Sequence, residues 1–223
     1  MLKIGKIAHS APASLITALV LANYAVLLAH PLNLVTADLG RHVKNGQLIL
    51  EGRFEVLKTN FYSYTHPDFP APNHHWLGGV IFYLVWRFSG FIGLQVFFII
   101  LSLAAFFIFF ALAQARAGPG LAGLLAVFVI PLLLERDEVR PEVFSYLLSG
   151  IFLWLMLKYR SGEISWRKLL VLPVLEILWI NLHIYFFLGL VIIGVFWLEN
   201  LITGGKKSFV NLPLYWGWRS WLP

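Results

Sequence analysis

The chain of 223 residues is unusually apolar: 59% of its residues are hydrophobic, only 13% are charged, and the mean hydropathy is +0.78. A soluble domain typically holds about 45–50% apolar and about 25% charged residues. A chain of this length cannot bury so much apolar surface in a core surrounded by water, which indicates that lipid forms part of its surroundings. The absence of cysteine excludes a disulfide framework, a thiolate metal site and a cysteine nucleophile.

The chain is also basic, with a formal net charge of +6 and an isoelectric point near 9.7. In membrane proteins, lysines and arginines concentrate in cytoplasmic loops, where they orient the helices and contact anionic lipid. Outside the apolar segments there is no basic stripe interleaved with aromatic residues, the pattern typical of nucleic-acid binding. Membrane lipid is therefore the expected partner, and nucleic acid is not.

The first third of the chain predicts one transmembrane helix followed by a long polar loop. Residues 11–29 are apolar and follow Lys3 and Lys6, and their apolar run exceeds the roughly 7–15 residues of a signal-peptide core. Residues 30–75 carry many charged and histidine side chains, and a loop of this length is typically functional or disordered. Within it, residues 37–50 have the spacing of a short amphipathic helix lying on the membrane.

Residues 76–88 are apolar but too few to cross a bilayer. A helix of about a dozen residues rises about 18 Å, whereas the hydrocarbon core is about 30 Å thick. We therefore expect a juxtamembrane or re-entrant helix here. The remaining predicted spans are residues 91–113, 120–134, 142–157, 169–182 and 184–202. The whole chain, 1–223, is thus predicted to be one all-α membrane domain, a polytopic transmembrane helix bundle.

The positions of lysine and arginine predict how this bundle is oriented. If residues 76–88 do not cross, the basic positions all face the cytoplasm: Lys3, Lys6, Arg116, the 158–168 loop and Lys206-Lys207. The Asp38 loop, the His74-His75 pair, the charged run 135–142 and the Asn181–His183 segment then face the other side. If residues 76–88 do cross, the middle of this map inverts.

Two groups in the polar loop are candidates for chemistry. Asp38 is suited to act as a general base or a metal ligand, and equally to cap a helix over residues 37–50. His74 and His75 stand where the loop meets the next helix, and histidine serves as acid, base, metal ligand or phosphate donor. A structural interpretation stays open for this pair, with Asn73 starting the helix and Trp76 anchoring it at the headgroups.

Further polar residues stand in or at the ends of the predicted spans. The segment 140–142 enters a helix, where a proline suits the first turn and Glu142 is favoured by the helix dipole. A carboxylate at membrane depth is costly and is therefore a functional candidate, both here and at Glu176. Asn181 and His183 are suited to substrate binding or to hydrogen bonds between helices.

These motifs occur in an order that resembles the polytopic membrane glycosyltransferases of the GT-C class. The ordered set comprises Asp38, Gly46, Gly52, Asn60-Phe61-Tyr62-Ser63-Tyr64-Thr65, Asn73-His74-His75-Trp76-Leu77, Tyr83, Gly90, Arg140-Pro141-Glu142 and Trp179-Ile180-Asn181-Leu182-His183. It is most similar to the branch related to the dolichyl-phosphate-mannose protein mannosyltransferases and runs from about Asp38 to Glu199. His75 stands where that branch typically has a glutamate.

The resemblance implies transfer of a sugar from a polyprenyl-phosphate donor to an acceptor on the non-cytoplasmic face. Asp38 matches the loop aspartate that acts as base on the acceptor hydroxyl, or that helps to hold a divalent metal in some members. Glu142 falls near the place where relatives often carry a second acidic residue. The residues implied to bind substrate are His74, His75, Arg140, Asn181 and His183.

Members of this class usually have more helices and often twice this length, so the chain is expected to correspond to an N-terminal portion of such a protein. Two alternatives therefore stay open beside the transferase. One is a non-catalytic membrane protein that binds or transports a lipid or solute, for which an internal inverted repeat would be typical, and none is visible. The other is an inactive, truncated transferase.

Overall fold

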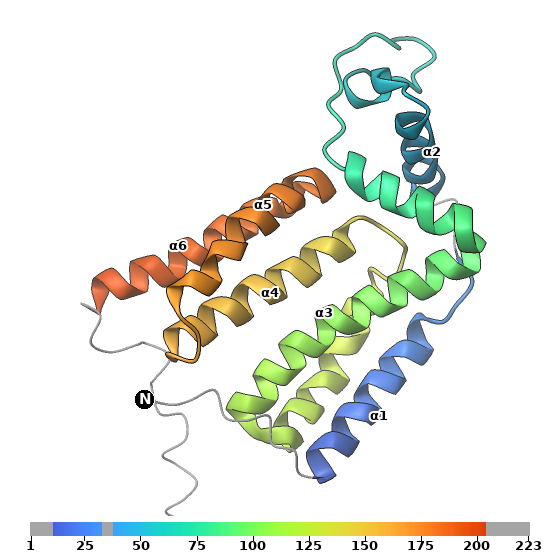
Figure 1. The fold of residues 1–223 in the computed structure, drawn as a ribbon. Helices are drawn as coiled ribbons and strands as arrows, with labels where there is room; N and C mark the ends of the chain where they lie inside the picture. Colours follow the sequence, from blue (N-terminus) through green and yellow to red (C-terminus); the bar gives the residue numbers. More distant parts are fainter. Residues whose placement is uncertain (1–10, 33–37, 204–223) are drawn as a thin grey trace, which may run out of the picture.

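The computed structural model describes residues 11–32 and 38–203, and in that part of the chain it is an all-α helical bundle without strands (Figure 1). Its elements are α1 (Ala11–Leu28), α2 (Leu39–Leu50), the 3-10 helix η1 (Phe54–Leu57), α3 (Trp76–Leu134), α4 (Glu142–Arg160), η2 (Trp166–Leu170), α5 (Val171–Leu182), η3 (Ile184–Phe186) and α6 (Phe187–Ile202). The predicted all-α fold class is confirmed.

The long helix α3 consists of three helical segments separated by two glycines. Gly90 (φ 66°, ψ −164°) and Gly118 (φ 80°, ψ 162°) adopt positive φ values that only glycine tolerates readily, so the chain turns at each of them. The segment 76–89 lies across one end of the bundle, and the next two segments run antiparallel beside α1 (Figure 1). The apolar residues 76–88 thus form a helix distinct from the one that follows.

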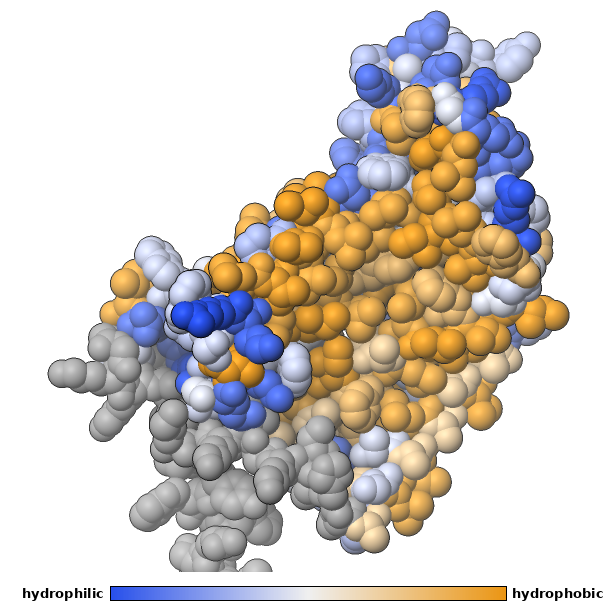
Figure 2. Space-filling model, in the orientation of Figure 1, coloured by the Kyte–Doolittle hydropathy of each residue, from blue (hydrophilic) through white to orange (hydrophobic). Residues whose placement is uncertain are grey.

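Within residues 11–32 and 38–203, four helical stretches are long and apolar enough to cross a membrane, judged by length and composition: Ala11–Leu28, Trp76–Leu134, Glu142–Arg160 and Ile184–Ile202. Figure 2 shows an apolar belt around the helices, with a polar lobe over α2 at one end and a second polar region where α4 ends. Helix α6 is mostly exposed on this belt, because Gly189 is its one buried residue. These features define a membrane protein.

The core of the bundle lies between α3 and α4, and α1 and α5 pack against it. Its most deeply buried large side chains are Trp179, Phe82, Phe152, Leu28 and Leu94. A polar contact ties α1 to this core, since the buried Gln95 amide donates a hydrogen bond to the Leu28 carbonyl at 2.7 Å.

The two ends of the bundle differ in charge. The end with α2, which we call the upper end, also holds the connection 135–141 between α3 and α4 and the joint between α5 and α6 (Figure 1). The lower end holds the turn at Gly118 and the connection between α4 and α5. Its basic side chains, Arg116, Lys158, Arg160, Arg167 and Lys168, outnumber its acidic ones, Glu163 and Glu199.

The helix expected over residues 37–50 is present as α2, but it does not depend on a membrane surface for burial. Its buried side chains, including Leu39, Val43 and Leu48, pack against α3 and the 3-10 helix η1. The polar stretch that follows is ordered as η1 and a hairpin-like loop, in which Asn60 and Ala71 donate backbone hydrogen bonds to Phe69 and Lys58. Together, α2, η1 and this loop form the polar lobe.

Candidate functional site

The polar lobe is held on the bundle by a close crossing of α2 and the first segment of α3. A Cβ on Gly46 would lie 2.2 Å from the Gly79 carbonyl oxygen, and a Cβ on Gly79 would lie 2.8 Å from the His42 carbonyl oxygen. Small residues allow two helix backbones to approach this closely. One helical turn before each glycine stands a histidine, His42 on α2 and His75 at the start of α3, so the crossing brings these rings together.

Three histidines from distant parts of the chain meet above this crossing. The His75 ring lies 5.9 Å from the His42 ring and 5.3 Å from the His183 ring, measured between ring centroids. The ring of His74, its neighbour in the sequence, lies 6.1 Å from the His75 ring. The joint between α5 and α6 is thereby connected to the polar lobe.

The pKa values of these histidines are lowered by their surroundings. Burial, with the nearby Arg41 charge, lowers the pKa of His42 to about 4. Burial, with the neighbouring His75, lowers the pKa of His183 to about 4, and burial also lowers the pKa of His75. All three rings are therefore neutral at pH 7 and able to accept as well as donate hydrogen bonds.

The tautomer of the neutral His183 ring is set by its contact with a buried serine on α4. The Trp179 indole nitrogen, which is a donor only, donates to Ser145 Oγ at 2.7 Å. Ser145 Oγ lies 2.9 Å from His183 Nδ1, and its own proton is available for that contact. A neutral His183 consequently accepts at Nδ1 and carries its proton on Nε2, which is the nitrogen left for other partners.

Asn181 is also joined to the polar lobe, although through a tryptophan. The Trp76 indole nitrogen donates to the Asn181 side-chain oxygen at 2.7 Å, and the Asn181 amide donates back to the Ile177 carbonyl. The end of α5 and the beginning of α3 are thus fixed to each other twice, by this bond and by the His75–His183 ring contact.

A polar pocket of about 260 Å³ opens in the lobe itself, between α2 and the loop that leads to α3. His74 and His75 line it, together with Arg41 and the buried Asn45. The remaining lining residues are Val56, Thr59, Asn60, Phe61, Tyr62, Ala71, Pro72 and Asn73. The Tyr62 hydroxyl donates to the Asn45 side-chain oxygen at 2.6 Å and so closes one side of the pocket.

Asp38 does not itself line this pocket, but it forms an ion pair with Arg41, which does, and we call this pair the rim of the pocket. The Arg41 guanidinium donates to the Asp38 carboxylate at 2.9 Å, and the Asp38 side chain is 68% exposed. Asp38 occupies the N-cap position of α2, but its side chain makes no capping hydrogen bond. Its backbone is left-handed, with φ 53°, a conformation that aspartate tolerates better than most residues. The carboxylate is therefore directed to the arginine rather than to the helix end.

Arg140 and Glu142 lie in a separate part of the upper end. Arg140 forms an ion pair with Glu138 in the connection between α3 and α4. Glu142 is the first residue of α4, after Pro141 at the N-cap position, as the predicted helix start requires. Neither of them is among the residues that line the polar pocket.

Glu176 faces protein, as its place in an apolar segment requires. A Cβ on Gly189 of α6 would lie 2.4 Å from its carboxylate, so α6 packs directly on this group. Both carboxylate oxygens are buried without a hydrogen-bond partner in the part of the chain that the structure describes. It belongs to the helix interface and lies outside the polar pocket.

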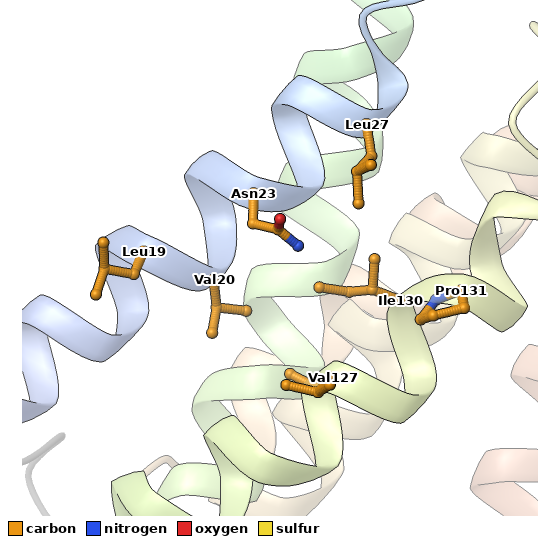
Figure 3. Close-up of a pocket in the computed structure, with 8 residues that line it drawn as sticks. Leu19, Val20, Asn23, Leu27, Val127, Ile130 and Pro131 are labelled. Atoms are coloured by element: carbon orange, nitrogen blue, oxygen red, sulfur yellow. The ribbon is translucent and has the colours of Figure 1, made fainter.

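A second hollow lies in the apolar belt and holds none of the predicted site residues. This groove of about 360 Å³ runs between α1 and the third segment of α3, and Figure 3 shows Val20 and Leu27 on the side of α1 that faces Val127, Ile130 and Pro131. Asn23 is its polar member (Figure 3).

The residues that sequence reasoning missed are those that build the pocket and its support. His42 and Asn45 follow Asp38 at one and two helical turns on an amphipathic helix, a spacing that indicates a shared face. Ser145 gave no such signal, since its role depends on Trp179 and His183 in another helix. Within residues 11–32 and 38–203, no group of three or more His, Asp or Glu side chains has a geometry able to hold a metal ion.

No protein-family model, curated protein or solved structure matches the chain.

Proposed function

We propose that this protein is a membrane glycosyltransferase-like enzyme that transfers a sugar from a polyprenyl-phosphate donor to an acceptor hydroxyl on the non-cytoplasmic side. The observation that carries this proposal is the polar pocket at the upper end, with the Asp38–Arg41 pair at its rim and His74 and His75 in its wall. The ordered sequence motifs imply the type of reaction, and the pocket is the proposed binding site for its substrate.

In the proposed reaction the Asp38 carboxylate takes the proton of the acceptor hydroxyl. The acceptor oxygen then bonds to the anomeric carbon of the sugar, while the bond from that carbon to the phosphate oxygen breaks and polyprenyl phosphate leaves. Arg41 and His74 are placed to offset the negative charge that develops on the phosphate.

The other candidate residues have supporting roles in this proposal. Neutral His183 and Asn181 hold His75 and Trp76 in position through the contacts described above. Glu142, at the start of α4, and Arg140, in the connection before it, lie at the same upper end and complete its set of charged groups.

We also propose that the chain crosses the membrane several times, with its N-terminus in the cytoplasm and the polar lobe outside. The basic lower end and the polar, mixed-charge upper end support this orientation, because lysine and arginine loops stay on the cytoplasmic side. Lys3, Lys6 and Lys206-Lys207, which also support it, lie outside the described residues.

The proposed activity is tested with membranes that contain the full chain and with radiolabelled polyprenyl-phosphate mannose. We expect donor consumption above that of control membranes, and a loss of at least about 100-fold in the Asp38→Asn variant. Asp68→Asn is the matched control, since Asp68 is an exposed carboxylate before α3 that, among the described residues, makes no ion pair with a residue of the pocket. The proposal is overturned if the donor is not consumed or if Asp38→Asn consumes it at the unaltered rate.

A further inference from the structure

The polar pocket is lined mainly by uncharged groups that both donate and accept hydrogen bonds. The Asn45 oxygen is engaged by Tyr62, and the Asn73 oxygen accepts the His75 backbone N–H at 3.1 Å, so each of these side chains keeps an NH₂ group for another partner. The Asn60 carboxamide has no hydrogen-bond partner among the described residues and offers both donors and acceptors. The hydroxyls of Thr59 and Tyr62 donate to protein groups and keep their lone pairs as acceptors.

This set of groups discriminates between classes of ligand. A phosphate accepts hydrogen bonds almost exclusively and cannot donate to the lone pairs of Thr59, Tyr62 and Asn60. A sugar hydroxyl donates one bond and accepts others, so several hydroxyls on one ring can satisfy both kinds of group. The positive charge, on Arg41, lies at the rim where the Asp38 carboxylate already engages it.

The size and the remaining walls of the pocket agree with a single sugar ring. Its volume of about 260 Å³ is just below the roughly 300–1,000 Å³ of pockets for drug-sized ligands. Val56, Phe61 and Pro72 supply apolar surface for the C–H groups of such a ring. The buried Asn45, 6% exposed, is a polar group fixed at the base of the pocket by its bond to Tyr62.

We propose that this pocket binds one neutral hexose ring through the carboxamides of Asn45, Asn60 and Asn73, with the anomeric carbon toward the Asp38–Arg41 rim. This inference rests on the proposed function and deepens it, because it assigns the hexosyl group of the donor to the lobe. The lipid phosphate then lies outside the pocket, near Arg41 and His74. Sugar recognition is thereby separated from phosphate recognition within one site.

Binding is measured on the full chain in lipid nanodiscs by saturation-transfer NMR with methyl α-mannopyranoside, and inorganic phosphate serves as a competitor. We expect the hexoside to bind and phosphate not to displace it. Asn60→Ala should weaken binding about 3- to 10-fold, the effect of one neutral hydrogen bond. Because Asn60 is exposed, its truncation leaves the packing of the lobe intact. Asn23→Ala is the matched control, an asparagine outside the pocket.

Three results would overturn the assignment: no hexoside binding, equal affinity in Asn60→Ala and the unaltered chain, or displacement by phosphate alone, which would make the pocket an anion site. Transfer assays on the same variants keep the two proposals apart. Asn60-dependent hexoside binding without any donor consumption would contradict the enzyme and retain the pocket. Donor consumption with an unaltered KM in Asn60→Ala would contradict the pocket and retain the enzyme.

Discussion

At the scale of single residues, the upper end of the bundle is organised by groups whose hydrogen-bonding options are few. Trp179 can only donate, and this leaves the Ser145 proton for His183 and sets which nitrogen of that ring accepts. Ser145 is 1% exposed, so none of these bonds can be replaced by water without rearrangement. A single small hydroxyl thus connects α4 with the end of α5 and the joint that follows it.

Replacement of Ser145 by alanine should therefore destabilise the protein. The change leaves two buried polar groups, Trp179 Nε1 and His183 Nδ1, without their partner, at a cost of about 1–3 kcal/mol for each group. Thermal unfolding of the purified chain in detergent measures this loss. Ser149→Ala is the matched control, because Ser149 bonds only to carbonyls of its own helix, and it should shift the midpoint far less. Equal shifts in both variants would contradict the proposed network.

The neutral histidines predict a particular dependence of stability on pH. The pKa of His42 and of His183 is about 4 in the folded chain, below the ordinary value of 6.5, so between these values the unfolded chain binds protons that the folded chain does not. Stability is therefore fully present above about pH 6.5 and falls as the pH is lowered from there to about 4. Unfolding midpoints at pH 7.5, 6 and 5 test this.

Two histidine variants identify the source of that pH dependence. His42→Gln removes one of the titrating rings, so its unfolding midpoint should fall less steeply with acidification than that of the unaltered chain. His66→Gln alters an exposed ring in the loop and should keep the original dependence. The same slope in all three proteins would show that other groups are responsible.

At the scale of elements, the sequence predicted which segments are helical better than it predicted what they contact. Amphipathic spacing indicated the helix at 37–50. The apolar segment 76–88 is short and is followed by Ser-Gly, which indicated a separate helix there. It did not reveal that α2 buries its apolar face on α3, because the contact depends on Gly46 meeting Gly79, 33 positions away. In a sequence, a glycine within a helical pattern indicates low helix propensity. It does not indicate which other segment packs closely against it.

The crossing of α2 and α3 gives a prediction at this scale. In Gly46→Ala the new Cβ would lie 2.2 Å from the Gly79 carbonyl oxygen, so the helices must separate and the lobe should loosen. Limited proteolysis of the loop 51–75 should then be faster than in the unaltered chain. Gly40→Ala provides the control, because nothing lies within 4 Å of a Cβ there and alanine favours helix. Unchanged proteolysis of Gly46→Ala would mean that the crossing does not hold the lobe.

In the candidate site, too, the sequence predicted local features better than the contacts between distant residues. Local motifs pointed to His74, His75 and His183, and the structure brings these three together. Arg140 and Glu142 were grouped with them through the resemblance, yet Arg140 pairs with Glu138 in the α3–α4 connection and Glu142 begins α4. Residues distant in sequence converge only where packing permits, and single-residue patterns contain little information about that packing.

At the scale of the whole molecule, a polar lobe and a basic region stand at opposite ends of an apolar belt (Figure 2). The chain has no cysteine, so a single introduced thiol reports the side on which its position lies. We expect Glu55→Cys, in η1 of the lobe, to react with a membrane-impermeant maleimide added to intact cells. Ser165→Cys, exposed at the lower end, should react only after the membrane is opened. The reverse pattern would contradict the proposed orientation.

The contacts of His75 and Trp76 also determine the order in which the upper end can be completed as the chain is synthesised. The lobe needs only α2 and the start of α3, which emerge close together, whereas Trp76 waits for Asn181, 105 residues later. The polar lobe can thus fold early, and its attachment to the joint between α5 and α6 is delayed until most of the membrane helices have been inserted. A ribosome stalled before Asn181 would present the lobe without the His183 contact, which makes this joint the last part of the upper end to form.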